Sequence, residues 1–289
     1  MEPLVSDTEN IEPTYEKNIG SRLISVLMNE ELAPYCLNTY INSFSGMGVD
    51  NPEQHAQKTN ELLSQDKPLR EREREIWEYL KTLSVHYTPF ESYVAGLVNE
   101  RRDIMFKQVA PNLLIEGKTL DFGAGNGEFM RQVHASFPKL DIEGWDVVSD
   151  DSKGQVQVYD GKVVPRDDKF YDQAYATTVL HHTADPFAGA EEMARLTKER
   201  LILIETIPGE HTGDRKKDWD ITFVADYFWR LIHRSTEPVP GSYLTAEEWQ
   251  KLFTERLGFK LKHFENLGQD QKTITVKHIL AVFERTRVV

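Results

Sequence analysis

This sequence of 289 residues has only one cysteine, no long apolar run and no excess of basic residues, and each of these features excludes a class of protein. Cys36 is the single cysteine, so it cannot close an intramolecular disulfide or build a thiolate zinc site. Scarce cysteine also fits a reducing compartment. The sequence has no internal repeat and no low-complexity tract, and it predicts no metal centre.

No apolar run approaches the roughly 18 to 20 residues that a bilayer-spanning helix needs. The chain starts with acidic residues, among them Glu2, Asp7 and Glu9, where a secretory signal would carry a basic segment followed by an apolar one. We therefore expect a soluble, cytoplasmic protein without a membrane partner.

Acidic residues outnumber basic ones, 47 to 34, which gives a formal net charge of −13. Nucleic-acid binding needs clustered Lys and Arg for phosphate contacts, so we expect no nucleic-acid partner. Hydrophobic residues make up 39% of the chain and aromatic residues 10%, enough to bury a sizeable core. The length predicts one or two domains.

The first 110 residues show the spacing of helices and no alternating strand pattern. In one segment Ile76, Trp77, Leu80 and Leu83 recur at helical spacing. We predict a helical N-terminal cap or lid over residues 1–110, with helical segments at 19–43, 55–63, 70–83 and 89–107. This helical half is also compatible with a homodimer formed through its helices.

Beyond residue 110 the pattern changes to alternating strands and helices. Strands are predicted at 118–122, 141–147, 155–160, 173–180, 201–206, 259–265 and 277–284. Helices are predicted at 128–137, 186–198 and 245–257, the last with Thr245 as its N-cap. This alternation predicts an α/β fold over residues 111–289, a Rossmann-like, doubly wound and mostly parallel sheet of seven strands.

The segment 208–243 interrupts that alternation and is rich in aromatic and polar residues. Long insertions beyond the carboxyl edge of a parallel sheet are where ligands are commonly held. We therefore predict that residues 208–243 form an insertion on the substrate side.

The sharpest local signal is a glycine-rich turn between a strand and a helix, with Gly123, Gly125 and Gly127 in the sequence TLDFGAGNGEFM. Glycine lets the backbone turn sharply and lets a ligand approach without a Cβ clash. The helix start offers unpaired N–H groups to a negatively charged ligand group. The dinucleotide fingerprint G-x-G-x-x-G differs, because here the third glycine comes one residue early.

Two acids stand at the ends of consecutive predicted strands. Asp121 precedes the glycine turn, and Asp146 follows Gly127 by nineteen residues. A carboxylate at this second position can accept both hydroxyls of a ribose, as in nucleotide-binding sheets. The alternative is an ordinary turn residue at a strand end.

Together these motifs resemble class I S-adenosylmethionine-dependent methyltransferases, of the small-molecule type that includes the ubiquinone and menaquinone methyltransferases. The resemblance rests on LDxGxGxG at 120–127, on GWD at 144–146 and on YDxAYATTVLHHTADP at 171–186. It covers about residues 111 to 284, and it does not specify a substrate.

The resemblance implies roles for residues of the cofactor site. The turn of Gly123, Ala124, Gly125 and Gly127 would bracket the methionine part of S-adenosylmethionine, and Asp121 would hold its amino group. Ribose would bind Asp146, with adenine beside Val147 and its amino group at Asp160. The sulfonium would lie close to Thr177 and Thr178.

A base is needed if the methyl acceptor is a hydroxyl or an ammonium group. The candidates are His181, His182, Tyr227 and His233, with His211 and Tyr243 as further possibilities. The histidine pair has a structural alternative, in which one ring packs beneath the site. A metal bound by the pair is not expected, because adjacent residues at a strand end point to opposite faces.

The leading hypothesis is S-adenosylmethionine-dependent methylation of a small molecule in specialised or cofactor metabolism. The favoured acceptor atom is oxygen, followed by nitrogen, sulfur or carbon. Three alternatives remain: the same fold and cofactor used for another reaction, a nicotinamide-dependent oxidoreductase, and a non-catalytic binding protein.

Overall fold

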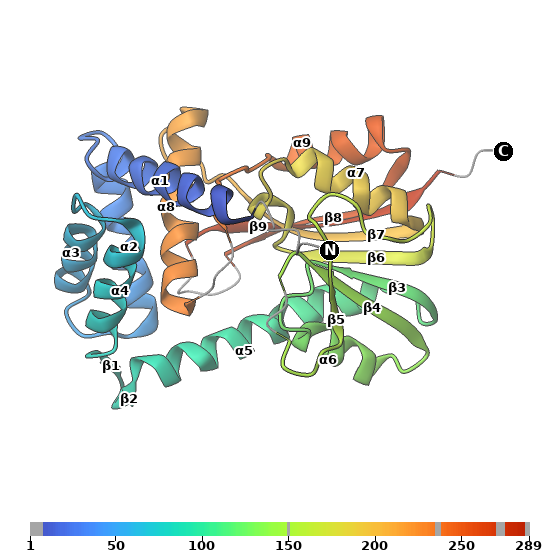
Figure 1. Cartoon of the computed structure of the whole chain (residues 1–289), viewed down its shortest axis with the longest axis horizontal. Helices are drawn as coiled ribbons and strands as arrows, with labels where there is room; N and C mark the ends of the chain where they lie inside the picture. The colour runs from blue at the N-terminus through green and yellow to red at the C-terminus, as the bar shows by residue number, and fades with distance from the viewer. Residues whose placement is uncertain (1–7, 149–150, 235–237, 270–274, 287–289) are drawn as a thin grey trace, which may run out of the picture. The chain divides into compact units, whose positions relative to one another are not determined.

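The structure is a computed structural model that describes residues 8–148, 151–234, 238–269 and 275–286, with side chains from residue 16 onward (Figure 1). The chain divides into two compact units. The helical unit comprises Met1–Leu97, Gly209–Val239 and Gln271–Thr275. The sheet unit comprises Val98–Pro208, Pro240–Asp270 and Val276–Val289. Among the described residues, the helices are all too short or too polar to cross a membrane.

The helical unit contains four helices from the N-terminal region, the start of a fifth, and one that comes much later in the chain. They are α1 (Thr8–Leu27), α2 (Ala33–Met47), α3 (Pro52–Leu63), α4 (Leu69–Leu80), α5 (Phe90–Val109) and α8 (Arg215–His233). The boundary between the units falls within α5, after Leu97, so the rest of this helix belongs to the sheet unit. Helix α8 packs on α2, where the ring of Phe228 lies 4.7 Å from Tyr40 and 5.5 Å from Phe44.

Two local features of this unit differ from the prediction. The segment 19–43 is not one helix, because Asn29 ends α1 by accepting hydrogen bonds from the N–H groups of Glu31 and Leu32. A two-residue hairpin, β1 (Ser84–Val85) and β2 (Thr88–Pro89), also precedes α5. Its turn residues His86 and Tyr87 both have positive φ, and neither residue type signals such a turn in a sequence.

The sheet unit confirms the predicted fold class. Its strands are β3 (Gly117–Phe122), β4 (Leu140–Asp146), β5 (Val156–Val158), β6 (Tyr171–Thr177), β7 (Thr197–Ile207), β8 (Phe259–Gly268) and β9 (Lys277–Arg285). They form one seven-stranded sheet in the order β5-β4-β3-β6-β7-β9-β8. The pairings are parallel from β5 to β7, and β9 is antiparallel to both of its neighbours.

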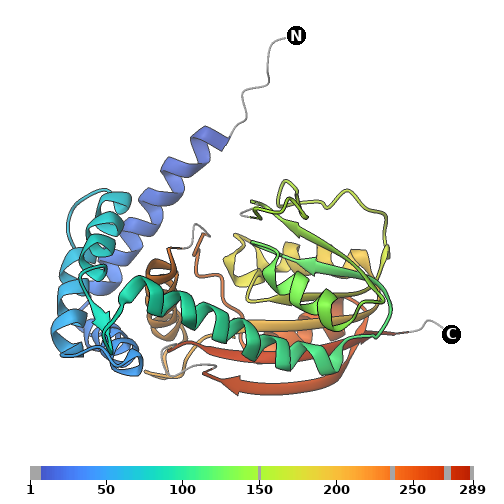
Figure 2. The ribbon, with the colours of Figure 1, turned by 90° about the horizontal axis from the view of Figure 1, so that it is seen from below.

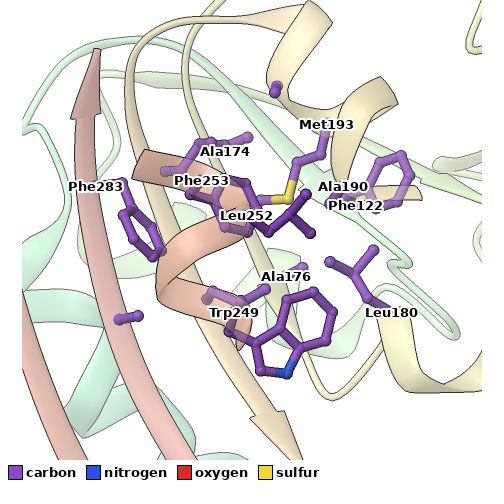
Figure 3. Close-up of a cluster of buried hydrophobic side chains, with 14 of the residues drawn as sticks. Phe122, Ala174, Ala176, Leu180, Ala190, Met193, Trp249, Leu252, Phe253 and Phe283 are labelled. Carbon is purple, nitrogen blue, oxygen red and sulfur yellow. The ribbon is translucent and has the colours of Figure 1, made fainter. Parts of the chain in front are cut away.

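Helices cover both faces of this sheet (Figures 1 and 2). One face carries α7 (Pro186–Leu196) and α9 (Ala246–Lys251), where Trp249, Met193 and Phe253 pack on the strands (Figure 3). On the other face Val133 of α6 (Glu128–Ser136) packs with residues of α5. Helix α9 begins with the predicted cap: Thr245 accepts from the N–H of Glu248, whose side chain accepts from the N–H of Thr245.

Two strands end two or three residues earlier than predicted, and both ends border the candidate site. Strand β6 stops at Thr177, and a 3-10 turn, Leu180–His182, follows where the strand was predicted to continue to residue 180. Strand β5 stops at Val158 because Asp160 turns the chain, accepting from the N–H groups of Lys162 and Val163.

Candidate active site

The candidate site lies at the carboxyl ends of β3, β4 and β6 in the sheet unit. Strands β4 and β5 lie on one side of β3, whereas the chain returns to the other side with β6. Ligands of open α/β sheets bind where the strand order reverses in this way. The glycine turn, Asp121, Asp146 and Thr177 all come from strand ends at or next to this point.

The three glycines of the turn after β3 differ in their surroundings, although all have positive φ. A Cβ atom added at Gly123 would lie 2.4 Å from Cγ1 of Val179, and one at Gly127 would lie 2.8 Å from Nη1 of Arg131. Within the described part of the chain, no heavy atom comes within 4 Å of a Cβ added at Gly125. Gly123 and Gly127 thus permit close packing, and Gly125 borders open space that a ligand can occupy.

Ala124 anchors this turn to the neighbouring strand. Its backbone N–H and that of Gly123 donate to the carbonyl oxygen of Trp145, at 3.1 and 2.8 Å. Its side chain is buried, and a Cβ added at Gly144 would lie 2.8 Å from it. Ala124 therefore fixes the turn against β4 through its backbone and points its methyl group toward the sheet.

Asp121 is buried beneath the turn and has a raised pKa. Its side chain is 2% exposed, and the hydroxyl of Tyr175 donates to Oδ2 at 3.0 Å. Burial and the nearby charge of Asp146 raise the pKa of Asp121 to about 7, although the Tyr175 hydrogen bond acts to lower it. Tyr175 did not stand out in the sequence, because its role depends on pairing opposite Asp121 in the sheet.

Asp146 ends β4 and is held against the glycine turn. Its Oδ2 accepts from the N–H of Gly125 at 2.7 Å, and its Oδ1 accepts from those of Val147 and Val148 at 2.7 and 3.3 Å. The carboxylate is half-buried, and carboxylate oxygens can accept more than one hydrogen bond each. This geometry joins the predicted ribose-binding acid to the turn that is predicted to hold the methionine part.

The region predicted to hold adenine is apolar and open. Val147 is 45% exposed, and the loop after β5 lies against it, since a Cβ at Gly161 would come 3.2 Å from Cγ1 of Val147. Asp160 is exposed and begins this loop. The N–H groups of Val163 and Lys162 hold the pKa of its carboxyl below the ordinary value. Asp160 thus orders the loop beside Val147.

The loop after β6 has a constrained backbone at the edge of the site. Thr178 has a φ of +58°, which is uncommon for a residue that is not glycine and is more so for a β-branched one. Its N–H donates to the carbonyl of Ile204 at 2.7 Å, and its hydroxyl donates to the carbonyl of Thr177 at 2.7 Å. Strained residues of this kind persist where the surroundings over-determine them.

The two histidines lie together, and the expectation that they point to opposite faces was wrong. Both belong to the 3-10 turn, in which successive side chains are not placed on opposite faces as in a strand. Their ring centroids are 4.1 Å apart. The ring of Tyr243 stacks on His181 with centroids 5.7 Å apart. His181 is buried and His182 is half-buried.

Glu205 is a second residue of this site, after Tyr175, that the sequence did not reveal. Its side chain is fully buried on β7, and Oε2 lies 2.5 Å from Nδ1 of His181. Oε1 accepts from the N–H groups of Val179 and Leu180 at 2.9 and 2.7 Å. Burial acts to raise its pKa, but His181 and these N–H groups hold the pKa below the ordinary value. The sequence does carry one signal for Glu205, because it is the single acidic residue within the apolar run 201–207.

The remaining base candidates are in the helical unit, on or next to α8. The hydroxyl of Tyr227 donates to Glu73, which also accepts from Arg230 at 2.5 Å. Burial and the charge of Glu73 raise the pKa of Tyr227 well above its ordinary value. The ring of His233 packs on Trp229, with centroids 3.9 Å apart. His211 is exposed before α8, and a catalytic role for any of these residues stays a prediction.

Solved structures share this fold at low sequence identity. One is a protein assigned as a sarcosine dimethylglycine methyltransferase from Galdieria sulphuraria, with 12% identity and a TM-score of 0.51, covering 67% of this chain and 88% of that one. Another is a geranyl diphosphate methyltransferase in complex with SAM, with 10% identity and a TM-score of 0.52, covering 68% and 90%.

Sequence comparison gives the family. No curated protein sequence matches the chain. The family described as "Methyltransferase domain" matches residues 94–263, which is more than half of the chain. That range includes the glycine turn and the strand ends that carry Asp121, Asp146 and Thr177. The chain therefore belongs to the methyltransferase domain family.

Proposed function

We propose that this protein transfers the methyl group of S-adenosylmethionine to a small-molecule acceptor. The observation that carries the proposal is the meeting of Asp121, Asp146 and the open side of Gly125 where the strand order reverses, within a methyltransferase domain. An ammonium group, ribose hydroxyls and a sulfonium are what S-adenosylmethionine would present to such a site.

The residues of the turn fit the charged end of this cofactor. The buried Asp121 would pair with the ammonium group, which would favour the ionised form of its carboxyl. The open space beside Gly125 would take the methionine chain, which can approach the backbone because no Cβ is present. Asp146 would accept hydrogen bonds from the ribose hydroxyls while it keeps its hydrogen bond from Gly125.

The other end of the cofactor would lie along the ends of β4 and β5. Val147 would contact the adenine ring, and Asp160 would accept from the adenine amino group or order the loop that does. Thr177 and Thr178, at the end of β6, would lie close to the sulfonium.

The bound sulfonium would supply an already activated methyl group, so the protein has to orient the acceptor and exclude water. For a hydroxyl or ammonium acceptor it must also remove a proton. The adjacent rings of His181 and His182 are the proposed bases from the sheet unit, and Tyr227 and His233 those from the helical unit.

The acceptor would be methylated on oxygen, or else on nitrogen, sulfur or carbon, in specialised or cofactor metabolism, as in the ubiquinone and menaquinone type. We propose that residues 1–110 and 208–243 together determine which acceptor is used. In support, the helices of the N-terminal region and α8 belong to one compact unit. Residues 111–289 would then carry the cofactor and the transfer step.

Mass spectrometry with S-adenosylmethionine carrying a deuterated methyl group tests the reaction. The enzyme is incubated with a panel of small-molecule hydroxyl and amine acceptors, and we expect release of S-adenosylhomocysteine together with an acceptor that carries the label. Asp146→Ala serves as the control with weakened cofactor binding. Labelled S-adenosylmethionine that is converted without any S-adenosylhomocysteine would instead show a different reaction of the same cofactor.

A further inference from the structure

Glu205 makes more contacts than a structural carboxylate of the sheet needs. Its Oε1 accepts hydrogen bonds from two backbone N–H groups. Its Oε2 lies 3.4 Å from the backbone nitrogen of His181 and 2.5 Å from Nδ1 of the same residue. One fully buried side chain from β7 therefore contacts three consecutive backbone N–H groups and one imidazole in the turn after β6.

The hydrogen-bond roles at His181 follow from this arrangement. An ionised carboxylate can only accept hydrogen bonds, so the imidazole nitrogen beside it must carry a proton. The pKa of Glu205 is held below its ordinary value, which keeps the carboxylate ionised. Nδ1 of His181 is therefore the donor to Glu205, and a change in the protonation of the ring takes place at Nε2.

We propose that Glu205 is a positioning residue that fixes a proton on Nδ1 of His181 and so makes Nε2 its proton-exchanging nitrogen. The same carboxylate holds the backbone of the turn that carries this histidine. A part for Nε2 in methyl transfer would rest on the proposed function. The placement of the proton is a property of the ligand-free protein.

The turn held by Glu205 also touches the proposed cofactor site. Val179, whose N–H donates to Glu205, packs its side chain against Gly123 so closely that a Cβ there would lie 2.4 Å away. Thr178, with its left-handed backbone, immediately precedes Val179. Glu205 would thus set the positions of His181 and of the first glycine of the turn through one set of hydrogen bonds.

Glu205→Gln separates the two parts of this role. The amide oxygen can replace Oε1 and keep the hydrogen bonds from Val179 and Leu180. The amide NH₂ then replaces Oε2, loses the 3.4 Å contact with the N–H of His181 and must donate to Nδ1 of His181. The opposite orientation would place two donors against two backbone N–H groups. The variant is therefore expected to move the proton of His181 from Nδ1 to Nε2.

The test is ¹⁵N NMR of the full-length, ligand-free protein with labelled histidine, with the His181 signals assigned by their loss in His181→Asn. In the unmodified protein we expect Nδ1 to be protonated, and in Glu205→Gln we expect it to lose that proton. Glu192→Gln is the matched control, because Glu192 is also a buried acceptor of a backbone N–H, from Val164 at 2.7 Å. It should leave the His181 signals unchanged.

An unprotonated Nδ1 in the unmodified protein would overturn the proposal, and this measurement does not depend on the folding of any Glu205 variant. An unchanged Nδ1 in folded Glu205→Gln would overturn it as well. For S-adenosylmethionine itself, calorimetry should give a dissociation constant within about threefold of the unmodified value for Glu205→Gln and about tenfold or more higher for Glu205→Ala. If the unmodified protein does not bind S-adenosylmethionine, the proposed function fails while the NMR result stands.

Discussion

Asp121 and Asp146 are two carboxylates at the ends of neighbouring strands, and their surroundings give them different properties. Asp121 is 2% exposed and accepts from one tyrosine hydroxyl, so burial raises its pKa to about 7. Asp146 is half-buried and accepts from backbone N–H groups of the glycine turn and of its own strand end. We expect Asp121 to respond to pH near neutrality.

Asp146→Ala should raise the dissociation constant of S-adenosylmethionine about tenfold or more. The change deletes charge-assisted hydrogen bonds, which contribute about 1.5 to 3 kcal/mol each. Calorimetric titration measures this. Asp146→Asn is the matched variant, because its amide oxygen can still accept from the N–H of Gly125, and it should lose less affinity than the alanine variant. Unchanged affinity in both variants would show that the ribose does not bind here.

The affinity for S-adenosylmethionine should increase as the pH rises through about 7. In the proposed site the ammonium group of the ligand would pair with the ionised form of Asp121, whose pKa in the free protein is about 7. Titrations about one unit below and above that pH would measure the change. Asp121→Asn should bind more weakly and lose this pH dependence. An Asp121→Asn variant that keeps the full slope would assign the effect to another group.

The same carboxyl should affect folding stability in the opposite direction. Its pKa is 3.8 in an unperturbed chain and about 7 in the fold, so the folded protein keeps a proton that the unfolded chain has lost between these values. The stabilising contribution is present below about pH 4 and is lost as the pH rises through about 7. Urea unfolding of the ligand-free protein should show Asp121→Asn to be less pH-dependent over this range. Equal slopes would contradict this.

Residues of the site could be predicted where one short segment carries the signal. The glycine turn and the two strand-end aspartates follow from the order of strand, turn and helix, and the structure places them at those strand ends. Tyr175 and Glu205 could not be found in this way. Their contacts with Asp121 and His181 join residues from different strands, and only the pairing of those strands brings them together.

At the scale of the elements, the glycine turn is built from positions with different requirements. Gly123 packs against Val179, whereas Gly125 faces open space among the described residues. Both have positive φ, which costs another residue about 1 to 2 kcal/mol. Substitutions at the two positions should therefore separate folding from binding.

Gly123→Ala should lower the free energy of unfolding by about 2 to 5 kcal/mol, because a clash adds to the backbone cost. Gly125→Ala should lower it by only about 1 to 2 kcal/mol and should reduce the affinity for S-adenosylmethionine. Gly268→Ala is the control. Gly268 lies at the end of β8 with a similar φ and no close neighbour among the described residues, so this variant should lose only the free energy that a positive φ costs alanine. Denaturant unfolding and calorimetry measure the two effects. Full affinity in Gly125→Ala would show that the ligand does not approach this turn.

The boundaries of elements were the hardest part to predict. The apolar spacing that indicated a strand over 173–180 continues into the turn, because Leu180 is buried in the core although it lies outside the strand. The strand ends where Thr178 adopts its left-handed backbone and the next N–H group, that of Val179, donates to Glu205. No local pattern encodes a hydrogen bond from a residue 26 positions away in the sequence.

At the scale of the whole molecule, the sequence predicts the sheet more completely than the helical unit. Alternating strands and helices determine the doubly wound class, and the structure confirms it. Gly209–Val239 belongs to one compact unit with the N-terminal helices, but the particular contacts that join them, such as that between Arg22 and Asp220, 2.9 Å apart, do not follow from the sequence. Amphipathic spacing shows that a helix has a buried face and does not show which helix covers it.

The distribution of charge gives a prediction for the whole chain. Residues 111–172, which carry most of the proposed cofactor residues, hold 7 bases and 12 acids, so their balance is 7 − 12 = −5. S-adenosylmethionine carries a sulfonium charge that S-adenosylhomocysteine lacks. Raising the ionic strength should therefore weaken S-adenosylmethionine binding more than S-adenosylhomocysteine binding. Calorimetry of both ligands at low and high salt measures this, and equal salt dependence would contradict it.

Isothermal titration of the full-length protein with S-adenosylmethionine tests the central claim most directly, because it requires no knowledge of the acceptor. We expect saturable binding at one site per chain, and we expect Asp146→Ala to weaken it. An absence of binding at several hundred micromolar ligand would contradict it.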